Sequence, residues 1–161
     1  MLKTLGTSLI IAGGILLAAP AFADTAANSA RDVAEAWLDA YQRQDFAAMT
    51  ALMTEETVFV DPTSFSIEAV TERIEWRGPD AITSGIAAWG MDHGVYDIER
   101  SYEASDRVIF IGRVDVVYGQ GEAAQTFRYP ITTIVTVDGD HVVEHRDYTD
   151  FGGATRVQPT H

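Results

Sequence analysis

Hydrophobic positions along the chain follow two periods, and the first part of the chain has the helical one. Between residues 29 and 41, apolar side chains recur three and four residues apart, which predicts an amphipathic helix. Its buried face would consist of Val33, Ala34, Trp37, Leu38 and Tyr41. The same spacing predicts a short second helix over residues 45–53 and a third over residues 80–89. Between the second and third helices, residues 57–61 predict a strand.

From residue 95 onward the pattern changes to alternation with period two, which is typical of strands. Four such segments follow one another: residues 95–103, 107–118, 126–137 and 141–151. Helices followed by a run of antiparallel strands predict an α+β fold, in which a strongly curved antiparallel sheet packs on about three N-terminal helices. Such a sheet forms a cone whose apolar mouth is a ready ligand site. Residues 63–77 show no clear period and fit either a helical turn or an irregular lid.

Several ionisable side chains occupy strand positions that would normally be apolar. Side chains two residues apart share a face of a strand, so Arg113 is expected to point with Asp115, and His145 with Asp147. These side chains also have purely structural interpretations. Arg113 and Asp115 would form an ion pair within the sheet, Asp147 would accept hydrogen bonds from backbone amides, and Asp61 would end a strand. Because a charge on an apolar face is costly unless paired, we expect Asp61, Arg113, Asp115 and Asp147 to converge in one sheltered pocket. Carboxylates held in unequal surroundings there would supply an acid and a base.

The first 23 residues have the features of a secretory signal peptide. Lys3 provides a basic start, an apolar run follows, and Ala21-Phe22-Ala23 is a small-x-small cleavage signal. We expect cleavage after Ala23, export to the periplasm or the medium, no membrane segment afterwards, and a single domain over residues 24–161.

The chain is strongly acidic, which narrows the class of partner. Its formal net charge is −13, and removal of residues 1–23 with their single basic residue makes it −14. An acidic surface disfavours nucleic acid and anionic lipid as partners. The chain has no cysteine, so it has neither a disulfide framework nor a lipoprotein anchor.

One string of residues matches a zinc-binding pattern but lies in the wrong context. His141-Val-Val-Glu144-His145 has the H-x-x-E-H spacing, which requires a helix so that both imidazoles lie on one side. Here the string follows an Asp-Gly turn among β-branched residues. On a strand the two imidazoles would lie roughly 13 Å apart and could not share one ion. We therefore expect no metal site.

The order of elements and two motifs resemble the nuclear transport factor 2-like superfamily, with its SnoaL-like members, over residues 30–151. Arg113-Val-Asp115 and Arg146-Asp147-Tyr148 are most similar to the pattern of limonene epoxide hydrolase. The resemblance implies a cone-shaped, cystatin-like roll that opens an epoxide of a small apolar oxygenated molecule with water, without a cofactor. Asp147 would be the base, Asp115 the acid and Arg113 the bridge between them. Matching pocket positions are Trp89, His93, Tyr129 and Ile131.

The chain departs from that pattern on its first strand and near its last motif. Where the family holds its water with Tyr and Asn, this chain has Phe59 and Asp61, and His145 replaces a bulky apolar residue. We expect Phe59 and His145 to line the substrate pocket with the residues named above.

Asp61-Pro62 after a strand also resembles ketosteroid isomerase, in which such an Asp moves a proton between carbons. By position, Trp37 and Thr132 stand where that enzyme has its oxyanion donors. An isomerase, dehydratase or cyclase that uses Asp61 or His145 therefore stays open, as does a non-catalytic module that binds a small ligand. The superfamily resemblance also implies a homodimer.

Overall fold

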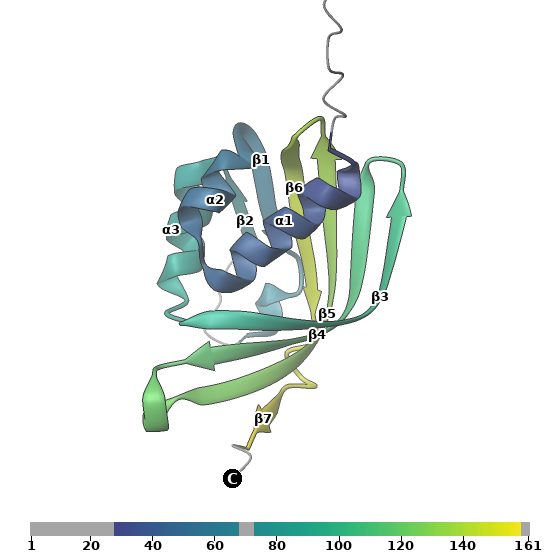
Figure 1. The fold of residues 1–161 in the computed structure, drawn as a ribbon. Helices are drawn as coiled ribbons and strands as arrows, with labels where there is room; N and C mark the ends of the chain where they lie inside the picture. Colours follow the sequence, from purple (N-terminus) through teal and green to yellow (C-terminus); the bar gives the residue numbers. More distant parts are fainter. Residues whose placement is uncertain (1–27, 68–72, 159–161) are drawn as a thin grey trace, which may run out of the picture.

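One curved sheet forms the framework of the protein, and its strand order brings distant segments together (Figure 1). The computed structural model describes residues 28–67 and 73–158. In that part of the chain the sheet has seven strands, ordered β2-β1-β6-β5-β4-β3, with β7 paired to β5. Only the β1–β6 pairing is parallel among them. The strands are β1 Met53–Asp61, β2 Ile74–Arg77, β3 His93–Ala104, β4 Arg107–Tyr118, β5 Gln125–Asp138, β6 His141–Thr149 and β7 Thr155–Val157.

Three helices pack against this sheet. The first, α1 (Ala30–Arg43), runs across the sheet face, while α2 (Phe46–Ala51) and α3 (Pro79–Ala88) lie on the side of β1 and β2 (Figure 1). Two short 3-10 turns, η1 (Ser64–Ser66) and η2 (Gly121–Ala123), interrupt the loops. Among the described residues, no helix has the length and hydropathy needed to cross a membrane.

The sequence of α1 accounts for both its start and its buried face. Ser29 and Asp32 form a capping box, in which each side chain accepts a hydrogen bond from the other's backbone N–H. The apolar positions predicted for this helix are all buried. Trp37 and Tyr41, one turn apart, therefore both point toward the sheet.

A bend at mid-length of β3 and β4 gives the sheet its curvature (Figure 1). The register of β3 against β4 shifts between Ile98 and Arg100, so Glu99 is the extra residue of a bulge. Gly112 of β4 lies opposite, and a Cβ at this position would collide with the carbonyl oxygen of Asp97. Glycine therefore allows the bulged strand to approach. On one side of the bend the strands pack on the helices, and on the other side they line a cavity.

The predicted α+β architecture and curved antiparallel sheet are confirmed, and three local predictions need correction. Residues 74–77 form a strand, although four residues are too few to reveal a period. The first strand begins at Met53, so the second helix ends earlier than predicted, at Ala51. The strand β7 was not predicted. The expected signal peptide, and residues 68–72 of the expected lid, lie outside the described residues.

Candidate functional site

A cavity of about 650 Å³ lies on the concave side of the sheet, beyond its bend. Its size falls within the range of small-molecule sites, and most of its walls are apolar or aromatic. Aliphatic and other small side chains come from several elements: Ile67, Ile74, Met91, Gly94, Val114, Val116, Ile131 and Ala154. The aromatic walls are Tyr41, Trp89, Tyr96, Tyr118, Phe127, Tyr129 and Phe151. The remaining lining residues are polar: Gln42, Asp61, Ser66, Asp147 and Thr149.

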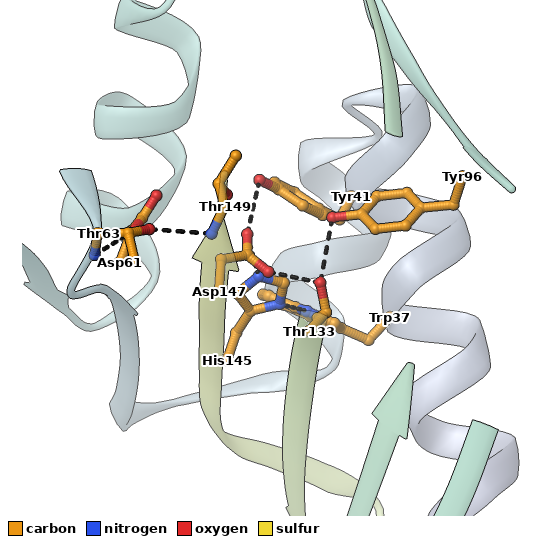
Figure 2. Close-up of polar contacts among 9 residues, drawn as sticks. All are labelled: Trp37, Tyr41, Asp61, Thr63, Tyr96, Thr133, His145, Asp147 and Thr149. Atoms are coloured by element: carbon orange, nitrogen blue, oxygen red, sulfur yellow. Dashed lines mark hydrogen bonds and ion pairs between the residues drawn. The ribbon is translucent and has the colours of Figure 1, made fainter. Parts of the chain in front are cut away.

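Asp147 lies on this cavity near the end of β6, with its side chain almost fully buried. Thr133 on the neighbouring β5 donates its hydroxyl to Asp147 Oδ1 at 2.5 Å, as Figure 2 shows. Tyr41 of α1 donates to Oδ2 at a much longer 3.5 Å. Because both partners donate, the ionised form of the carboxylate satisfies them.

His145 lies behind Asp147 on the same face of β6, and its side chain is completely buried. The indole Nε1 of Trp37 donates to His145 Nδ1 at 2.8 Å (Figure 2). An indole N–H can only donate, so Nδ1 accepts and the ring proton is assigned to Nε2. Nε2 lies 2.9 Å from Asp147 Oδ2, but its N–H is not aligned for a hydrogen bond. The imidazole also stacks on Phe59, with ring centroids 4.5 Å apart, which fixes its plane.

Asp61 ends β1 and lines the same cavity. Its Oδ1 accepts hydrogen bonds from the backbone N–H of Thr63 at 2.9 Å and from the Thr63 hydroxyl at 2.6 Å. The same hydroxyl oxygen accepts from the backbone N–H of Thr149, which ties the end of β1 to β6 (Figure 2). Burial raises the pKa of Asp61 above its ordinary value, and the nearby Asp147 carboxylate raises it further, against the opposing effect of the Thr63 hydrogen bonds.

Two phenols complete the polar part of the cavity. Burial raises the pKa of both Tyr41 and Tyr96 well above the ordinary tyrosine value, and the charge of Asp147 adds to the effect. Both phenols therefore keep their protons at neutral pH. The Tyr96 hydroxyl lies 3.4 Å from Thr133 Oγ1, so this contact, like that of Tyr41, is long. These hydroxyls are thus available as donors to a ligand oxygen.

The predicted convergence of four charges is wrong for Arg113 and Asp115. Val114 and Val116 of β4 line the cavity, so the alternating residues face the other side of the sheet. There Arg113 pairs with Asp97 at 2.6 Å and Asp115 pairs with Arg128 at 2.7 Å. Because β4 is apolar on both faces, its period does not indicate which face is inward. The acid and the bridging arginine of the epoxide hydrolase pattern are therefore not beside Asp147.

The residues predicted to bind substrate fall into two groups. Trp89, Tyr129 and Ile131 line the cavity. Phe59 and His145 lie outside its lining as stacked, fully buried side chains. His93 lies at the start of β3, where its Nδ1 contacts the carboxylate of Asp92 at 2.8 Å, and it does not line the cavity either.

Sequence reasoning missed the hydroxyl donors of the site. Tyr41 was recognised only as a buried helix position, and Tyr96 and Thr133 were not singled out. Thr132, suggested by resemblance to ketosteroid isomerase, is paired with Tyr148 on the alternate face, while Thr133 contacts Asp147. A tyrosine on the buried face of a helix or strand was the available indication, since its hydroxyl needs a partner when buried.

The part of the chain that the structure describes holds no grouping of side chains that suggests a metal centre. Within residues 28–67 and 73–158 there is no cluster of three His, Cys, Asp or Glu side chains with metal-binding geometry. The H-x-x-E-H string lies on strand β6, as predicted, with His141 exposed and His145 buried.

Comparison with known proteins places this architecture in a family. A family model described as SnoaL-like domain matches residues 34–145. No curated protein matches the chain. Among solved structures, a protein from Shewanella putrefaciens CN-32 assigned as a SnoaL-like polyketide cyclase is 20% identical, with a TM-score of 0.65 over 76% of this chain and 80% of that one.

Two enzymes of different activity are also similar in structure. The Δ5-3-ketosteroid isomerase from Mycobacterium sp. is 13% identical, with a TM-score of 0.65 over 80% of this chain and 98% of that one. A limonene epoxide hydrolase-like epoxide hydrolase from M. tuberculosis is 20% identical, with a TM-score of 0.58 over 75% and 82% of the two chains. At such identities the likeness establishes the fold and not the activity. The match over residues 34–145, with the nuclear transport factor 2-like fold that these structures share, shows that the chain belongs to the SnoaL-like domain family.

Proposed function

We propose that the protein is an acid–base catalyst that moves a proton within a small, mainly apolar carbonyl compound, as an isomerase, dehydratase or cyclase does. The fold hosts cyclases, isomerases, epoxide hydrolases and binders, and its members bind small molecules, such as 17-OHP in a designed binder and trimethylamine in another structure. The observation that carries the proposal is the pair Asp61 and Asp147 on one apolar cavity, beside the two phenols.

The proposed step divides the work among these groups. Asp61 accepts a proton from the carbon next to the carbonyl, and the electrons of that C–H bond move onto the carbonyl oxygen. Tyr41 or Tyr96 donates a hydrogen bond to the oxyanion that forms. Asp61 then returns the proton to a carbon or to a leaving oxygen. A carboxyl whose pKa is raised above its ordinary value by burial is a stronger base than an exposed aspartate, which favours the first half of this transfer.

Opening of an epoxide by the limonene epoxide hydrolase pattern has less support. It requires Asp115 and Arg113 beside Asp147, and both side chains lie on the opposite face of the sheet. The proton-transfer alternative needs only residues that line the cavity.

A hydrogen-exchange assay tests the proposal without knowledge of the natural substrate. The purified protein is incubated in D₂O with a panel of cyclic ketones and enones, and loss of the α-proton signal is followed by NMR. We expect catalysed exchange that Asp61→Asn lowers by about 10² to 10⁴-fold, the usual contribution of a positioned base. Tyr41→Phe should lower it less.

Asp115→Asn is the matched control, because it removes a carboxylate from the outer face and leaves the cavity intact. Exchange by this variant should equal that of the wild type. Exchange that survives Asp61→Asn would refute the assigned base. Turnover of an epoxide that depends on Asp115 would restore the epoxide hydrolase interpretation.

Export and dimerisation are further proposals that rest on the sequence. The apolar N-terminal run and the Ala21-Phe22-Ala23 signal support removal of residues 1–23 and a periplasmic or secreted mature protein. N-terminal sequencing of the exported protein should begin at Asp24, and light scattering should give the mass of a dimer.

A further inference from the structure

The distribution of charge in the fold leaves the two cavity carboxylates without a cationic side chain. Eight of the ten arginines in the described part of the chain form ion pairs with carboxylates elsewhere, such as Arg113 with Asp97 and Arg128 with Asp115. The chain's single lysine, Lys3, lies outside that part. No arginine, lysine or histidine is among the described residues that line the cavity.

His145 does not supply the missing positive charge. Its Nδ1 accepts the indole proton of Trp37, and a second ring proton on Nδ1 would face that N–H directly. In this arrangement the imidazole is neutral. Asp147 thus has hydroxyl partners in Thr133 and Tyr41 but no countercharge.

Asp61 has no cationic partner either, although the residue is only 5% exposed. Both of its side-chain hydrogen bonds, from the N–H and the hydroxyl of Thr63, end on Oδ1. Among the described side chains none donates to Oδ2, and Asp61 lines the cavity. A carboxylate that lines an apolar cavity without a countercharge is costly, so it marks a place where a cationic ligand can compensate.

The walls of the cavity are suited to the same kind of ligand. Seven of the twenty described lining residues are aromatic. Tyr129 and Phe151 meet edge to face, with ring centroids 5.9 Å apart, and Trp89 is a further aromatic residue of the lining. Aromatic faces attract organic cations, most strongly where water is excluded.

We infer that the cavity selects an organic cation, a protonated or quaternary amine on an apolar skeleton, which the carboxylates of Asp61 and Asp147 neutralise and the aromatic walls enclose. This deepens the proposed function and rests on it in taking the cavity as the site of turnover. With such a substrate, Asp147 still balances the positive charge while Asp61 carries the transferred proton. Anionic ligands are excluded by the same two carboxylates.

Binding of three probes of nearly the same shape tests the inference. Benzyltrimethylammonium carries the charge, neopentylbenzene replaces its nitrogen by carbon, and benzylphosphonate is an anion. Affinities for the purified protein are measured by calorimetry or by tryptophan fluorescence. The cation should bind at least about tenfold more tightly than the neutral isostere, from cation–π attraction together with the two carboxylates, and the phosphonate should not bind.

Neutralising variants then locate the preference. Asp61→Asn and Asp147→Asn should each lower the affinity for benzyltrimethylammonium about tenfold while leaving that for neopentylbenzene unchanged. The matched control is Asp80→Asn, an exposed carboxylate in the first turn of α3, which should change neither. Because Asp147 belongs to a buried network, circular dichroism checks the fold, and Asp61→Asn alone suffices if the other variant unfolds.

The outcomes separate this inference from the proposed function. Equal affinity for the cation and its isostere, or no binding of either, would overturn the cation preference. A clear cation preference that Asp61→Asn does not reduce would place the cation elsewhere and would also overturn it. Proton exchange measured as above stands or falls independently, since neutral ketones report on it.

Discussion

Replacing Trp37 with phenylalanine removes the donor from a hydrogen bond between two fully buried side chains. The indole Nε1 lies 2.8 Å from His145 Nδ1, and neither residue is exposed. Without the indole, the Nδ1 lone pair has no described donor, and an unsatisfied buried acceptor costs about 1–3 kcal/mol. The smaller ring also leaves a space worth on the order of 1 kcal/mol. We therefore expect a loss of about 2–4 kcal/mol, a large part of the ~5–15 kcal/mol typical of a domain.

A double-mutant cycle separates the hydrogen bond from the packing. His145→Leu removes the acceptor at similar volume, so the Trp37→Phe substitution should cost less in that background than in the wild type. Urea unfolding followed by circular dichroism gives the four free energies, and we expect a coupling of roughly 1–2 kcal/mol. Long-range ¹H–¹⁵N spectra of wild-type protein should show the His145 proton on Nε2.

Three results would refute this reasoning. The first is a Trp37→Phe variant that loses less than about 0.5 kcal/mol, since a buried unsatisfied acceptor cannot be that inexpensive. The second is strict additivity of the two substitutions. The third is a ring proton on Nδ1 of His145, which would reverse the assigned tautomer.

Other expected outcomes concern charge and backbone geometry. Because the pKa of Asp61 is raised, the folded protein keeps a proton on this carboxyl at pH values just above 3.8, where the unfolded chain has lost it. The contribution of Asp61 to the free energy of unfolding therefore falls as the pH rises from 3.8 to the higher pKa of the folded state. Asp61→Asn should therefore be more stable than the wild type at pH 7 in urea unfolding, with no gain below pH 3.8. Gly112→Ala forces Cβ against the Asp97 carbonyl, and its midpoint of unfolding should fall by an amount equivalent to about 1–3 kcal/mol. Arg113→Ala breaks surface ion pairs with Asp97 and Glu99 and should change the free energy of unfolding by less than about 1 kcal/mol; a larger loss would mean that this side chain is needed inside the fold.

The architecture was predictable because long elements carry strong periods. The apolar face of α1 and the alternation in β3 to β6 both extend over many residues, and they fixed the class and order of elements. β2 was missed because only Ile74 and Trp76 alternate with polar neighbours over its four residues. Its place at the sheet edge comes from antiparallel pairing with β1, a long-range contact that no local pattern contains.

The candidate site was predictable only in part, for a reason specific to β4. Val114 and Val116 face the cavity, while Ile109 and Ile111 lie half-buried on the outer face, so apolar side chains occupy both parities. The charges of Arg113 and Asp115 could therefore be assigned to either face. Asp61 and Asp147 lacked this ambiguity, since strand β6 is buried at His145 and Asp147 and Asp61 closes a buried run.

The bend at Gly112 divides β4 into one half that packs in the hydrophobic core and another half that lines the cavity. Residues of β4 before it, such as Val108 and Phe110, belong to the hydrophobic core cluster, whereas Val114 and Val116 after it line the cavity. Substitutions beyond the bend can therefore alter which molecules fit, while the elements that drive folding stay untouched. Proteins with this bend can therefore change the side chains that line the cavity with a small loss of stability. This is one physical route by which a single fold comes to host many activities.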